Sequence, residues 1–352
     1  MRIAFIGVSH WHLPLYLDPA LAEPGFHVVA VSDPDPAVAN GVAARIGASG
    51  WTDWHAMCAQ TRPDFVFVLG RHCDMAEVGR DLIAQRIPFA IEKPCGLNAW
   101  EVADLASRAA AAGAFVAVPF VLRQSQMMQA IHETAADEPV HYLSFKFVGG
   151  SVDRYRQTGC EWMLERRLSG GGCLLNLGVH FLDLARVLFG AMQPVVAGAM
   201  ISNALEGLDT EDHAVVLLRA GGSACLVEVG YTYPAPHMSF DMHFSVRTAH
   251  HHFAAKDSEA LEILTAAQAR DLRPMPMTNV PYYPLFVRDV VARAASGRPP
   301  VADLSDMADV MTMVEAAYAM APLPIGSTQR PAYRPGRRSK KASTAAVKAA
   351  GV

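Results

Sequence analysis

The sequence predicts an α/β protein in two parts: a doubly wound parallel sheet at the N-terminus, then an α+β domain with a large, mainly antiparallel open sheet. In the first third of the chain, continuous apolar segments alternate with helical patterns, as parallel strands covered on both faces require. In the second half, segments of alternating polarity follow one another without helices, which is typical of a sheet with one solvated face. The length of 352 residues also favours two cores over one.

The first domain is predicted over residues 1–120, from repeated strand-then-helix units with short connections. Its elements are a strand over 3–6, a helix to about residue 21, a strand over 27–32, a helix ending at Gly47, strands over 65–69, 89–91 and 115–118, and helices over about 75–86 and 99–112. Because each strand is followed by a helix, the sheet should be parallel and Rossmann-like.

The second domain is predicted over residues 121–328. Its elements are a helix over about 127–135, strands over 140–148, 195–202, 212–219, 224–233 and 239–247, a helix opened by Gly170-Gly171-Gly172, and late helices over 284–296 and 303–320. An open sheet exposes a face or an edge that another copy of the chain can cover, so we expect a homodimer or homotetramer. Residues 329–352 are basic, contain no acid and are expected to form a disordered, solvated tail, with a nucleic-acid-binding arm as the alternative.

Composition narrows the range of functions. A hydrophobic content of 51% with 18% charged residues indicates an ordered globular protein. The formal net charge of -4 gives no reason to expect nucleic acid as a partner, and we identify no apolar segment long enough to span a membrane. The chain enters a strand at once, without the basic-then-apolar pattern of a signal peptide, so a cytoplasmic protein is expected. The six cysteines have no CxxC spacing, which indicates reduced thiols.

The first strand-to-helix turn, residues 7–12, is a partial match to the dinucleotide-binding fingerprint. That fingerprint has glycine at its first, third and sixth positions, and only Gly7 is retained, with Ser9 and His12 in the other two places. A helix N-terminus that follows such a turn can still hold a pyrophosphate. We therefore take Gly7, Ser9, His10 and His12 as candidate cofactor contacts, with packing as the competing interpretation for the two histidines.

Asp33 ends the second predicted strand, where a carboxylate can accept hydrogen bonds from the adenosine ribose. The next residues, Pro34, Asp35 and Pro36, offer no arginine for a ribose phosphate, and their added negative charge would repel one. NAD is therefore favoured over NADP. The alternative role for Asp33 is the N-cap of the following helix.

Two motifs together indicate a family. Ile91-Glu92-Lys93-Pro94 ends a predicted strand of the first domain, and the segment from Gly170 through Asn176 and His180 to Asp183 opens a helix of the second. Residues 120–123 and 297–301 fit the same pattern. From residue 1 to about 325 the chain resembles the Gfo/Idh/MocA oxidoreductases, relatives of glucose–fructose oxidoreductase and inositol dehydrogenase. The resemblance implies a nicotinamide cofactor between the two domains and a sugar-, inositol- or polyol-like substrate.

Oxidation of a secondary alcohol requires a group that accepts the hydroxyl proton. We assign His180 as that base and Lys93 as the cation that stabilises developing alkoxide charge. Asn176 lies one turn before His180 and can orient it, whereas the family usually has Asp there. Glu92 is expected to orient Lys93 or the ribose, and Pro94 to hold the turn rigid. The sequence thus predicts an NAD(H)-dependent dehydrogenase or reductase.

Four further residues are candidate substrate contacts: Arg123, Trp162, Asp183 and His237. Each has an alternative: a salt bridge at the domain hinge for Arg123, a structural hydrogen bond for Asp183, and subunit contacts for the two loop residues. The run His250-His251-His252 makes a poor metal site, because adjacent strand residues face opposite ways, so no metal is predicted.

Three other functions stay open from the sequence alone. An NAD-binding regulator with lost catalysis is favoured by Asn176. A lyase or glycosidase could use tightly held NAD transiently. A structural oligomer would need no ligand.

Overall fold

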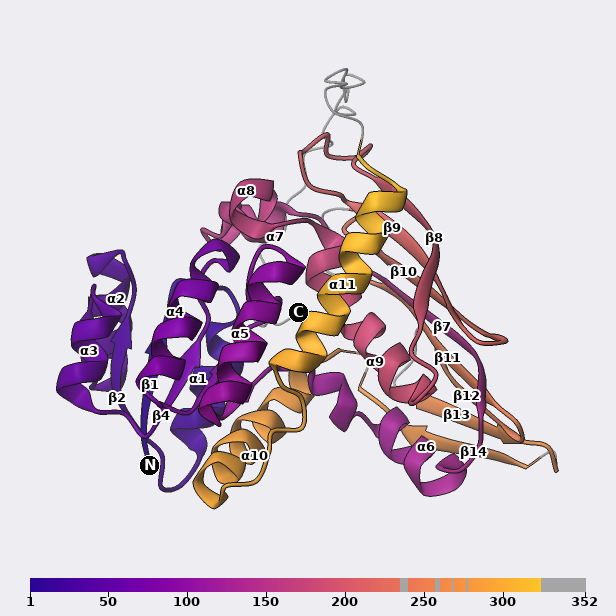
Figure 1. Cartoon of the computed structure of the whole chain (residues 1–352), viewed down its shortest axis with the longest axis horizontal. Helices are drawn as coiled ribbons and strands as arrows, with labels where there is room; N and C mark the ends of the chain where they lie inside the picture. The colour runs from indigo at the N-terminus through magenta and orange to yellow at the C-terminus, as the bar shows by residue number, and fades with distance from the viewer. Residues whose placement is uncertain (235–239, 257–259, 268, 277, 324–352) are drawn as a thin grey trace, which may run out of the picture.

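The computed structural model describes residues 1–234, 240–256, 260–267, 269–276 and 278–323. It contains two sheets with helices between and around them (Figure 1). Both predicted halves of the fold are present in the predicted order along the chain.

The N-terminal sheet has six parallel strands in the order β3-β2-β1-β4-β5-β6. Its strands are β1 (Arg2–Ile6), β2 (His27–Ser32), β3 (Ser49–Trp51), β4 (Phe65–Val68), β5 (Phe89–Ile91) and β6 (Val116–Ala117), and its helices are α1 (Leu13–Ala22), α2 (Pro36–Ile46), α3 (Trp54–Thr61), α4 (His72–Ala84) and α5 (Ala99–Ala112). Every residue of β4 and β5 is buried, which confirms the predicted sheet covered on both faces. The order along the sheet reverses between β1 and β4, and ligands of such sheets bind in the crevice at that point.

The sequence prediction missed β3 and α3 in this domain. β3 is a half-buried edge strand of only three residues, and its pairing with β2 defines it more than any pattern of its own. α3 is specified at its start, where the Asp53 carboxylate accepts the backbone N–H of His55 at 2.8 Å. Short elements of this kind leave too few apolar positions for periodicity to detect.

The C-terminal sheet has eight strands in the order β14-β13-β12-β11-β7-β10-β9-β8. Its strands are β7 (Val140–Val148), β8 (Val195–Ser202), β9 (His213–Ala220), β10 (Ser223–Gly230), β11 (Asp241–Thr248), β12 (His251–Lys256), β13 (Ala260–Thr265) and β14 (Arg270–Pro274). Only β7 and β10 pair in parallel, which confirms a mainly antiparallel sheet. The prediction stopped at five strands and missed β12 to β14, whose histidine-rich start and charged outer edge obscure the alternation of polarity.

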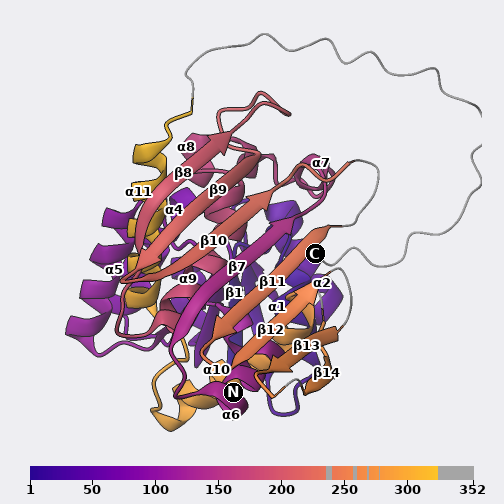
Figure 2. The same ribbon diagram turned by 90° about the vertical axis from the view of Figure 1, so that its right-hand side faces the viewer.

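Helices cover one face of this sheet, and the other face has no helix on it (Figure 2). The remaining helical elements are η1 (Val121–Gln124), α6 (Gln126–Ala135), α7 (Asp153–Gln157), η2 (Glu161–Leu164), α8 (Arg166–Ser169), η3 (Leu174–Gly178), α9 (Val179–Phe189), η4 (Val280–Tyr282), α10 (Tyr283–Ser296) and α11 (Leu304–Met320). Cross-strand register places six exposed apolar side chains on the helix-free face. They are Tyr142, Val195, Met200, Leu217, Leu264 and Leu272.

The last two described helices, α10 and α11, pack between the two domains. α10 packs on α1, and α11 lies against both α5 and β8. At the same junction the Val118 N–H donates to the Ala302 carbonyl at 3.0 Å. The last two described helices therefore contact both domains, which fixes the crevice between them.

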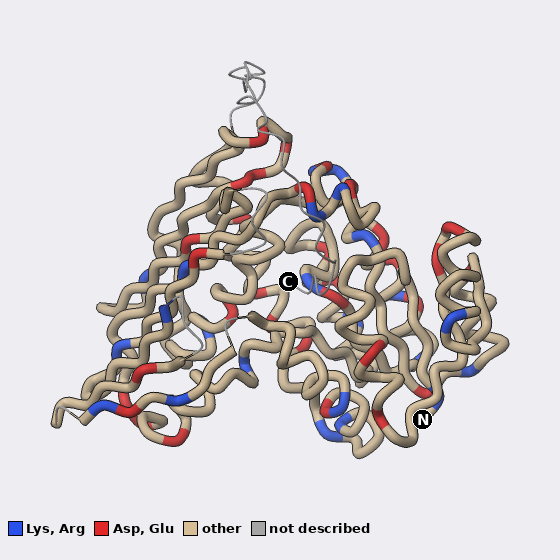
Figure 3. Tube along the Cα trace, turned by 180° about the vertical axis from the view of Figure 1, so that it is seen from behind, with Lys and Arg blue, Asp and Glu red and all other residues tan. Residues whose placement is uncertain are grey.

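The structure bears on two predictions from sequence, that no segment spans a membrane and that nucleic acid is not a partner. Among the described helices, the stretch Arg166–Phe189 has the length and hydropathy of a membrane span, which corrects the statement that no segment is long enough. Because 78% of its most apolar window is buried inside the protein, it fits the core helix of a globular domain. Lysines and arginines intermingle with acidic residues along both domains (Figure 3).

Candidate active site

The turn after β1 accepts only glycine at its first position. Gly7 has φ +78°, and a Cβ there would lie 2.4 Å from the backbone nitrogen of Gly70, at the end of β4. The two strand ends therefore approach at the switch point of the sheet, as a dinucleotide-binding turn requires. Ser9 is exposed beside this approach.

Asp33 lies at the end of β2 and faces that turn. Its Oδ2 accepts the backbone N–H of Ser9 at 2.8 Å, and its Oδ1 accepts that of Asp35 at 3.1 Å. The N-cap of α2 is Asp35, whose carboxylate accepts the Ala37 N–H at 2.8 Å, so the capping role considered for Asp33 belongs to its neighbour. Each Asp33 oxygen keeps a lone pair, which fits the hydroxyls of an adenosine ribose.

Glu92 follows β5 and is the most completely bonded carboxylate near the crevice. It accepts hydrogen bonds from His12 Nδ1 at 2.7 Å, from the Tyr16 hydroxyl at 2.7 Å and from the Lys93 backbone N–H at 2.9 Å. Burial favours its protonated form, but His12 and Lys93 outweigh burial and hold the pKa of Glu92 well below its usual range. Burial lowers the pKa of His12, with Glu92 opposing. His12, at the third glycine position of the fingerprint, thus fixes Glu92.

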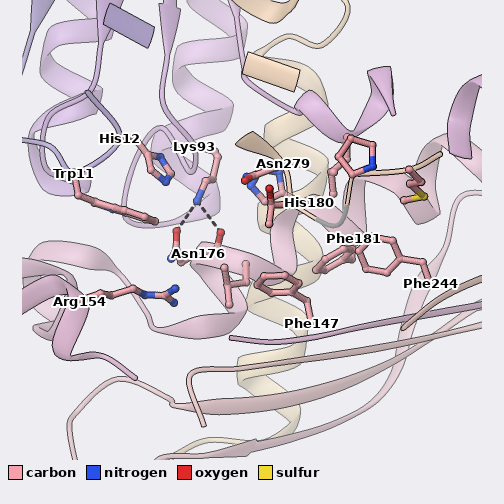
Figure 4. Close-up of a pocket in the computed structure, with 15 residues that line it drawn as sticks. Trp11, His12, Lys93, Phe147, Arg154, Asn176, His180, Phe181, Phe244 and Asn279 are labelled. Atoms are coloured by element: carbon pink, nitrogen blue, oxygen red, sulfur yellow. Dashed lines mark hydrogen bonds between the residues drawn. The ribbon is translucent and has the colours of Figure 1, made fainter. Parts of the chain in front are cut away.

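Lys93 extends from a turn closed by a cis bond to Pro94 and reaches across to the second domain (Figure 4). Its Nζ donates to the backbone oxygen of Asn176 at 2.7 Å and also to the Asn176 Oδ1. Burial lowers the pKa of Lys93 from 10.5 to about 8; Glu92 opposes that change and Arg154 adds to it. At pH 7 this amine is therefore mostly charged, with about a tenth of it uncharged.

Asn176 is held by two tyrosines as well as by Lys93. Its Nδ2 donates to the hydroxyls of Tyr155 at 2.8 Å and Tyr231 at 2.9 Å. Because both amide hydrogens have acceptors, the amide oxygen is directed at Lys93. Asn176 belongs to η3, a π-helical turn, a form common at functional sites.

His180 lies one turn later on α9 and lines the same pocket as Lys93 (Figure 4). Its ring meets Phe120 edge to face, with centroids 6.1 Å apart. Its buried Nδ1 has no hydrogen-bond partner among the described residues. Burial, and then the charge of Lys93, lower the pKa of His180 to about 3, so the imidazole is neutral at physiological pH.

A pocket lies between the domains, and about 630 Å³ of non-atom space surrounds its lining residues, part of which is open solvent. Its described lining includes two cations, Lys93 and Arg154, and no carboxylate. The lining residues are Trp11, His12, Lys93, Leu122, Phe147, Arg154, Asn176, Leu177, His180, Phe181, Phe244, Met275, Pro276, Thr278 and Asn279. Apolar walls with a few convergent polar groups are typical of a small-molecule site.

The structure brings together some predicted residues and not others. Lys93, Asn176, His180 and His12 share the pocket. Gly7, Ser9 and Asp33 meet at the neighbouring turn. Trp162 lies over that turn, with its centroid 5.7 Å from the His10 ring. Pro94 follows Lys93, and His237 lies outside the described residues.

Arg123 and Asp183 are not on the pocket wall. Arg123 forms a two-point pair with Asp183, at 2.8 and 2.6 Å, and contacts Asp306 at 2.9 Å. It also donates to the Val301 carbonyl at 2.8 Å. All of these partners belong to residues 121–328, so Arg123 forms a salt bridge within the second predicted domain, next to its boundary with the first. Its substrate role stays a prediction.

Sequence reasoning missed four residues around the pocket: Arg154, Tyr155, Tyr231 and Asn279. The first two lie in the polar, aromatic segment before Trp162, where a cation beside aromatic residues is the available signal. Tyr231 directly follows β10, and only pairing with β7 brings it near Asn176. Within the described ranges no group of three or more His, Cys, Asp or Glu side chains is arranged to hold a metal ion.

Comparison with known proteins identifies the family. Residues 1–120 match the model of an oxidoreductase family with an NAD-binding Rossmann fold, and residues 143–250 match the GFO/IDH/MocA C-terminal domain. The chain belongs to the Gfo/Idh/MocA family. This membership confirms the resemblance drawn from the two motifs and the predicted class, an NAD-binding oxidoreductase.

Three relatives illustrate the family. D-glucoside 3-dehydrogenase of Escherichia coli (strain K12) is 24% identical over 191 residues, and that alignment covers 54% of each protein, so the chain spans about half the length of this curated relative. A levoglucosan dehydrogenase, solved with NADH and levoglucosan, superposes with TM-score 0.78 at 16% identity, covering 91% of this chain and 98% of that one. The 3-ketoreductase KijD10 of Actinomadura kijaniata, solved with NADP and TDP-benzene, has TM-score 0.76 at 16% identity, with 92% and 98% covered. At these identities the two structures establish the shared fold.

Proposed function

We propose that this protein is an NAD(H)-dependent dehydrogenase or reductase that transfers a hydride to or from a hydroxyl-bearing carbon of a sugar-, inositol- or polyol-like substrate. One observation carries the proposal: Lys93 from the first domain meets Asn176 and His180 from the second in a single pocket. The sugar class is supported by the names of two relatives, a glucoside dehydrogenase and a levoglucosan dehydrogenase.

The cofactor would bind along the turn of residues 7–12. Gly7 permits the close approach of β1 and β4, Ser9 is exposed there, and Asp33 keeps lone pairs for ribose hydroxyls. A ribose 2′-phosphate would meet the carboxylates of Asp33 and Asp35, which favours NAD over the NADP found with the Actinomadura relative. When bound, nicotinamide accepts or supplies the hydride.

Lys93 is the group best placed to accept the hydroxyl proton. Burial lowers the pKa of Lys93 to about 8, with Glu92 opposing and Arg154 aiding that change. About a tenth of the amine is then uncharged at pH 7 and about half at pH 8, so Lys93 can serve as a general base in that range. His180 has a pKa lowered to about 3, by burial first and by Lys93 second, so it stays neutral and is suited to orient the substrate oxygen by a hydrogen bond. The environments therefore favour exchanging the roles assigned from sequence.

Asn176 has a defined part in this arrangement. Its oxygens anchor the Lys93 amine without adding a negative charge, and an Asp in its place would favour the charged amine. The neutral side chain that suggested a non-catalytic regulator is thus compatible with a lysine that accepts protons.

The protein would work as a homodimer or homotetramer in the cytoplasm. The exposed apolar side chains on the helix-free face of the C-terminal sheet support the assembly, because such a surface is usually covered. Light scattering would measure the oligomeric state directly, and a monodisperse monomer would count against it.

The direct test is turnover. We expect the purified protein to form NADH from NAD with at least one member of a panel of glucosides, free hexoses, inositols, uronic acids and sugar phosphates, or to consume NADH with the corresponding ketones. Absence of both reactions across the panel, despite NAD binding, would contradict the proposal. Cleavage of a glycosidic bond without net NADH would favour the transient-redox alternative.

A further inference from the structure

Arg154 is a buried cation that forms no ion pair with the described part of the chain. It lies on α7, is 8% exposed, and lines the pocket between the domains. Its Nε and Nη2 are buried with no hydrogen-bond partner, and no carboxylate among the described residues forms an ion pair with it. A buried charge is costly unless it is paired, so this guanidinium needs an explanation beyond packing.

Aromatic rings explain how the cation is tolerated but leave its donors unused. The guanidinium carbon lies 5.8 Å from the Trp11 ring centroid, 5.0 Å from Tyr155 and 5.1 Å from Tyr231. Contacts of this kind are electrostatically favourable. They orient the guanidinium plane, yet a ring face does not replace the oxygen acceptors that its N–H groups prefer.

The two unpartnered nitrogens lie on one edge of the guanidinium. Nε–H and one N–H of Nη2 point the same way, and this edge binds two oxygens of a carboxylate or phosphate side by side. Figure 4 shows the Arg154 side chain extending toward the pocket beneath Asn176. A modest side-chain rotation on ligand binding would present that edge, since α7 is a short helix of five residues.

The charge of the whole pocket agrees with an anionic ligand. Lys93 and Arg154 both line it, and no Asp or Glu belongs to its described lining. The nearest buried carboxylate, Glu92, already accepts from His12, Tyr16 and the Lys93 backbone. The field in the pocket therefore attracts a negative group.

We infer that the substrate is an acidic sugar or polyol, with a carboxylate or phosphate that pairs with Arg154 while its reacting hydroxyl meets Lys93. This inference rests on the proposed function for the reaction and adds the substrate class. It assigns Arg154 as the specificity residue, distinct from the proton-transferring lysine.

Binding separates this inference from the proposed reaction. Calorimetric titration of the NADH-loaded protein with D-glucuronate, D-glucose 6-phosphate and D-glucose should show one acidic ligand bound at least about 10-fold more tightly than glucose, given the strength of charge-assisted hydrogen bonds. The tighter of the two acids identifies carboxylate or phosphate. Equal affinities for all three, or no binding of either acid, would overturn the inference whether or not the protein turns over a neutral sugar.

Variants of α7 locate the effect. Arg154→Met should lower the ratio of acidic-ligand to glucose affinity by about 10- to 100-fold, and Arg154→Lys should restore part of it. Arg156→Met is the matched control, because Arg156 is on the same helix, half-exposed and paired with Asp153, and it should leave the ratio unchanged. Should Arg154→Met fail to fold, Arg154→Lys alone decides, since a full-strength preference in that variant would contradict a two-point contact. If Arg154→Met instead lowered the affinity for NAD and left the ratio of acidic-ligand to glucose affinity unchanged, Arg154 would be assigned to the cofactor pyrophosphate and the inference would be overturned.

Discussion

On the N-terminal wall of the pocket, the Glu92–Lys93 pair is fully bonded, and on the C-terminal wall His180 and Arg154 are not. The contrast holds for these side chains, because Trp11 Nε1 on the first wall has no partner among the described residues and Asn176 on the second is fully bonded. On the N-terminal wall, Glu92 accepts three hydrogen bonds and Lys93 donates two through its amine. On the C-terminal wall, Nδ1 of His180 and two nitrogens of Arg154 have no partner in the described part of the chain. A fully bonded group is positioned before any ligand arrives, whereas an unpaired buried donor gains its partner only on binding.

From this difference in hydrogen bonding we infer a separate role for each wall of the pocket. The bonded wall sets the geometry and the protonation of the lysine, so changes there should reduce the chemical step. The unbonded wall recognises the substrate, so changes there should reduce discrimination between ligands. Arg123 provides a reference for both, because it is a largely buried arginine whose three guanidinium nitrogens all have acceptors.

Removing the amine of the bonded wall should have the largest effect. We expect Lys93→Met to lower kcat/KM by about 1000-fold, the scale of general acid–base catalysis with charge stabilisation, while NAD still binds. Lys146→Met is the control, since Lys146 lies in a partly exposed pair with Asp241 on β7 and β11. Steady-state kinetics on both variants measure the effect, and a Lys93→Met enzyme with near wild-type turnover would remove the lysine from the chemistry.

Breaking the Arg123–Asp183 pair should lower the stability of the fold and leave ligand binding unchanged. Arg123→Met leaves Asp183, which is 1% exposed, with only Arg186 at 3.6 Å, and should reduce the free energy of unfolding by about 3 kcal/mol. Arg80→Met breaks a partly exposed pair with Asp104 and should cost less than about 1 kcal/mol. Urea denaturation measures both. An Arg123→Met protein of normal stability with a raised KM would instead support the substrate role predicted from sequence.

Changing the charge beside Lys93 should shift the pH profile. In the wild type, burial lowers the pKa of Lys93 to about 8; Arg154 adds to this effect and Glu92 opposes it. The uncharged amine is the proposed base. kcat/KM for oxidation should therefore rise with pH up to about 8 and then level off, and reduction should show the reverse. Asn176→Asp adds a carboxylate that favours the charged amine, so the rising limb should move to higher pH and oxidation at pH 7 should fall about 10-fold. His180→Gln is the comparison variant, and disappearance of the limb there would make His180 the base.

The sequence predicted the architecture well where patterns are long. β7, β8 and α5 have the boundaries expected from alternation or helical spacing. It also singled out Lys93, Asn176 and His180, because two motifs in separate domains imply one crevice. These features depend on local periodicity or on motif chemistry, both of which are present in the chain itself.

What the sequence could not supply is the set of partners made by tertiary contact. The two tyrosines that orient Asn176 come from α7 and from the end of β10, and nothing in their spacing predicts the meeting. The exchange of roles that we propose for Lys93 and His180 depends on burial, which lowers both pKa values by different amounts. The unpaired state of Arg154 is a property of its surroundings in space and has no sequence signature.

The smallest expected effect concerns the cofactor turn, which lies outside both walls. Asp33 is bonded to Ser9 and Asp35 by backbone contacts yet keeps lone pairs, so NAD should raise the melting temperature by a few degrees more than NADP does. Asp33→Asn keeps the size of the side chain and removes its charge. It should weaken NAD binding and permit the ribose 2′-phosphate of NADP, so the difference in melting temperature should narrow to within about 1 °C. Asp53→Asn, at the exposed start of α3, is the matched control and should retain the wild-type difference. Equal shifts by NAD and NADP in the wild type would mean that Asp33 serves the turn alone, as a structural acceptor for two backbone N–H groups, and that the ribose is read elsewhere.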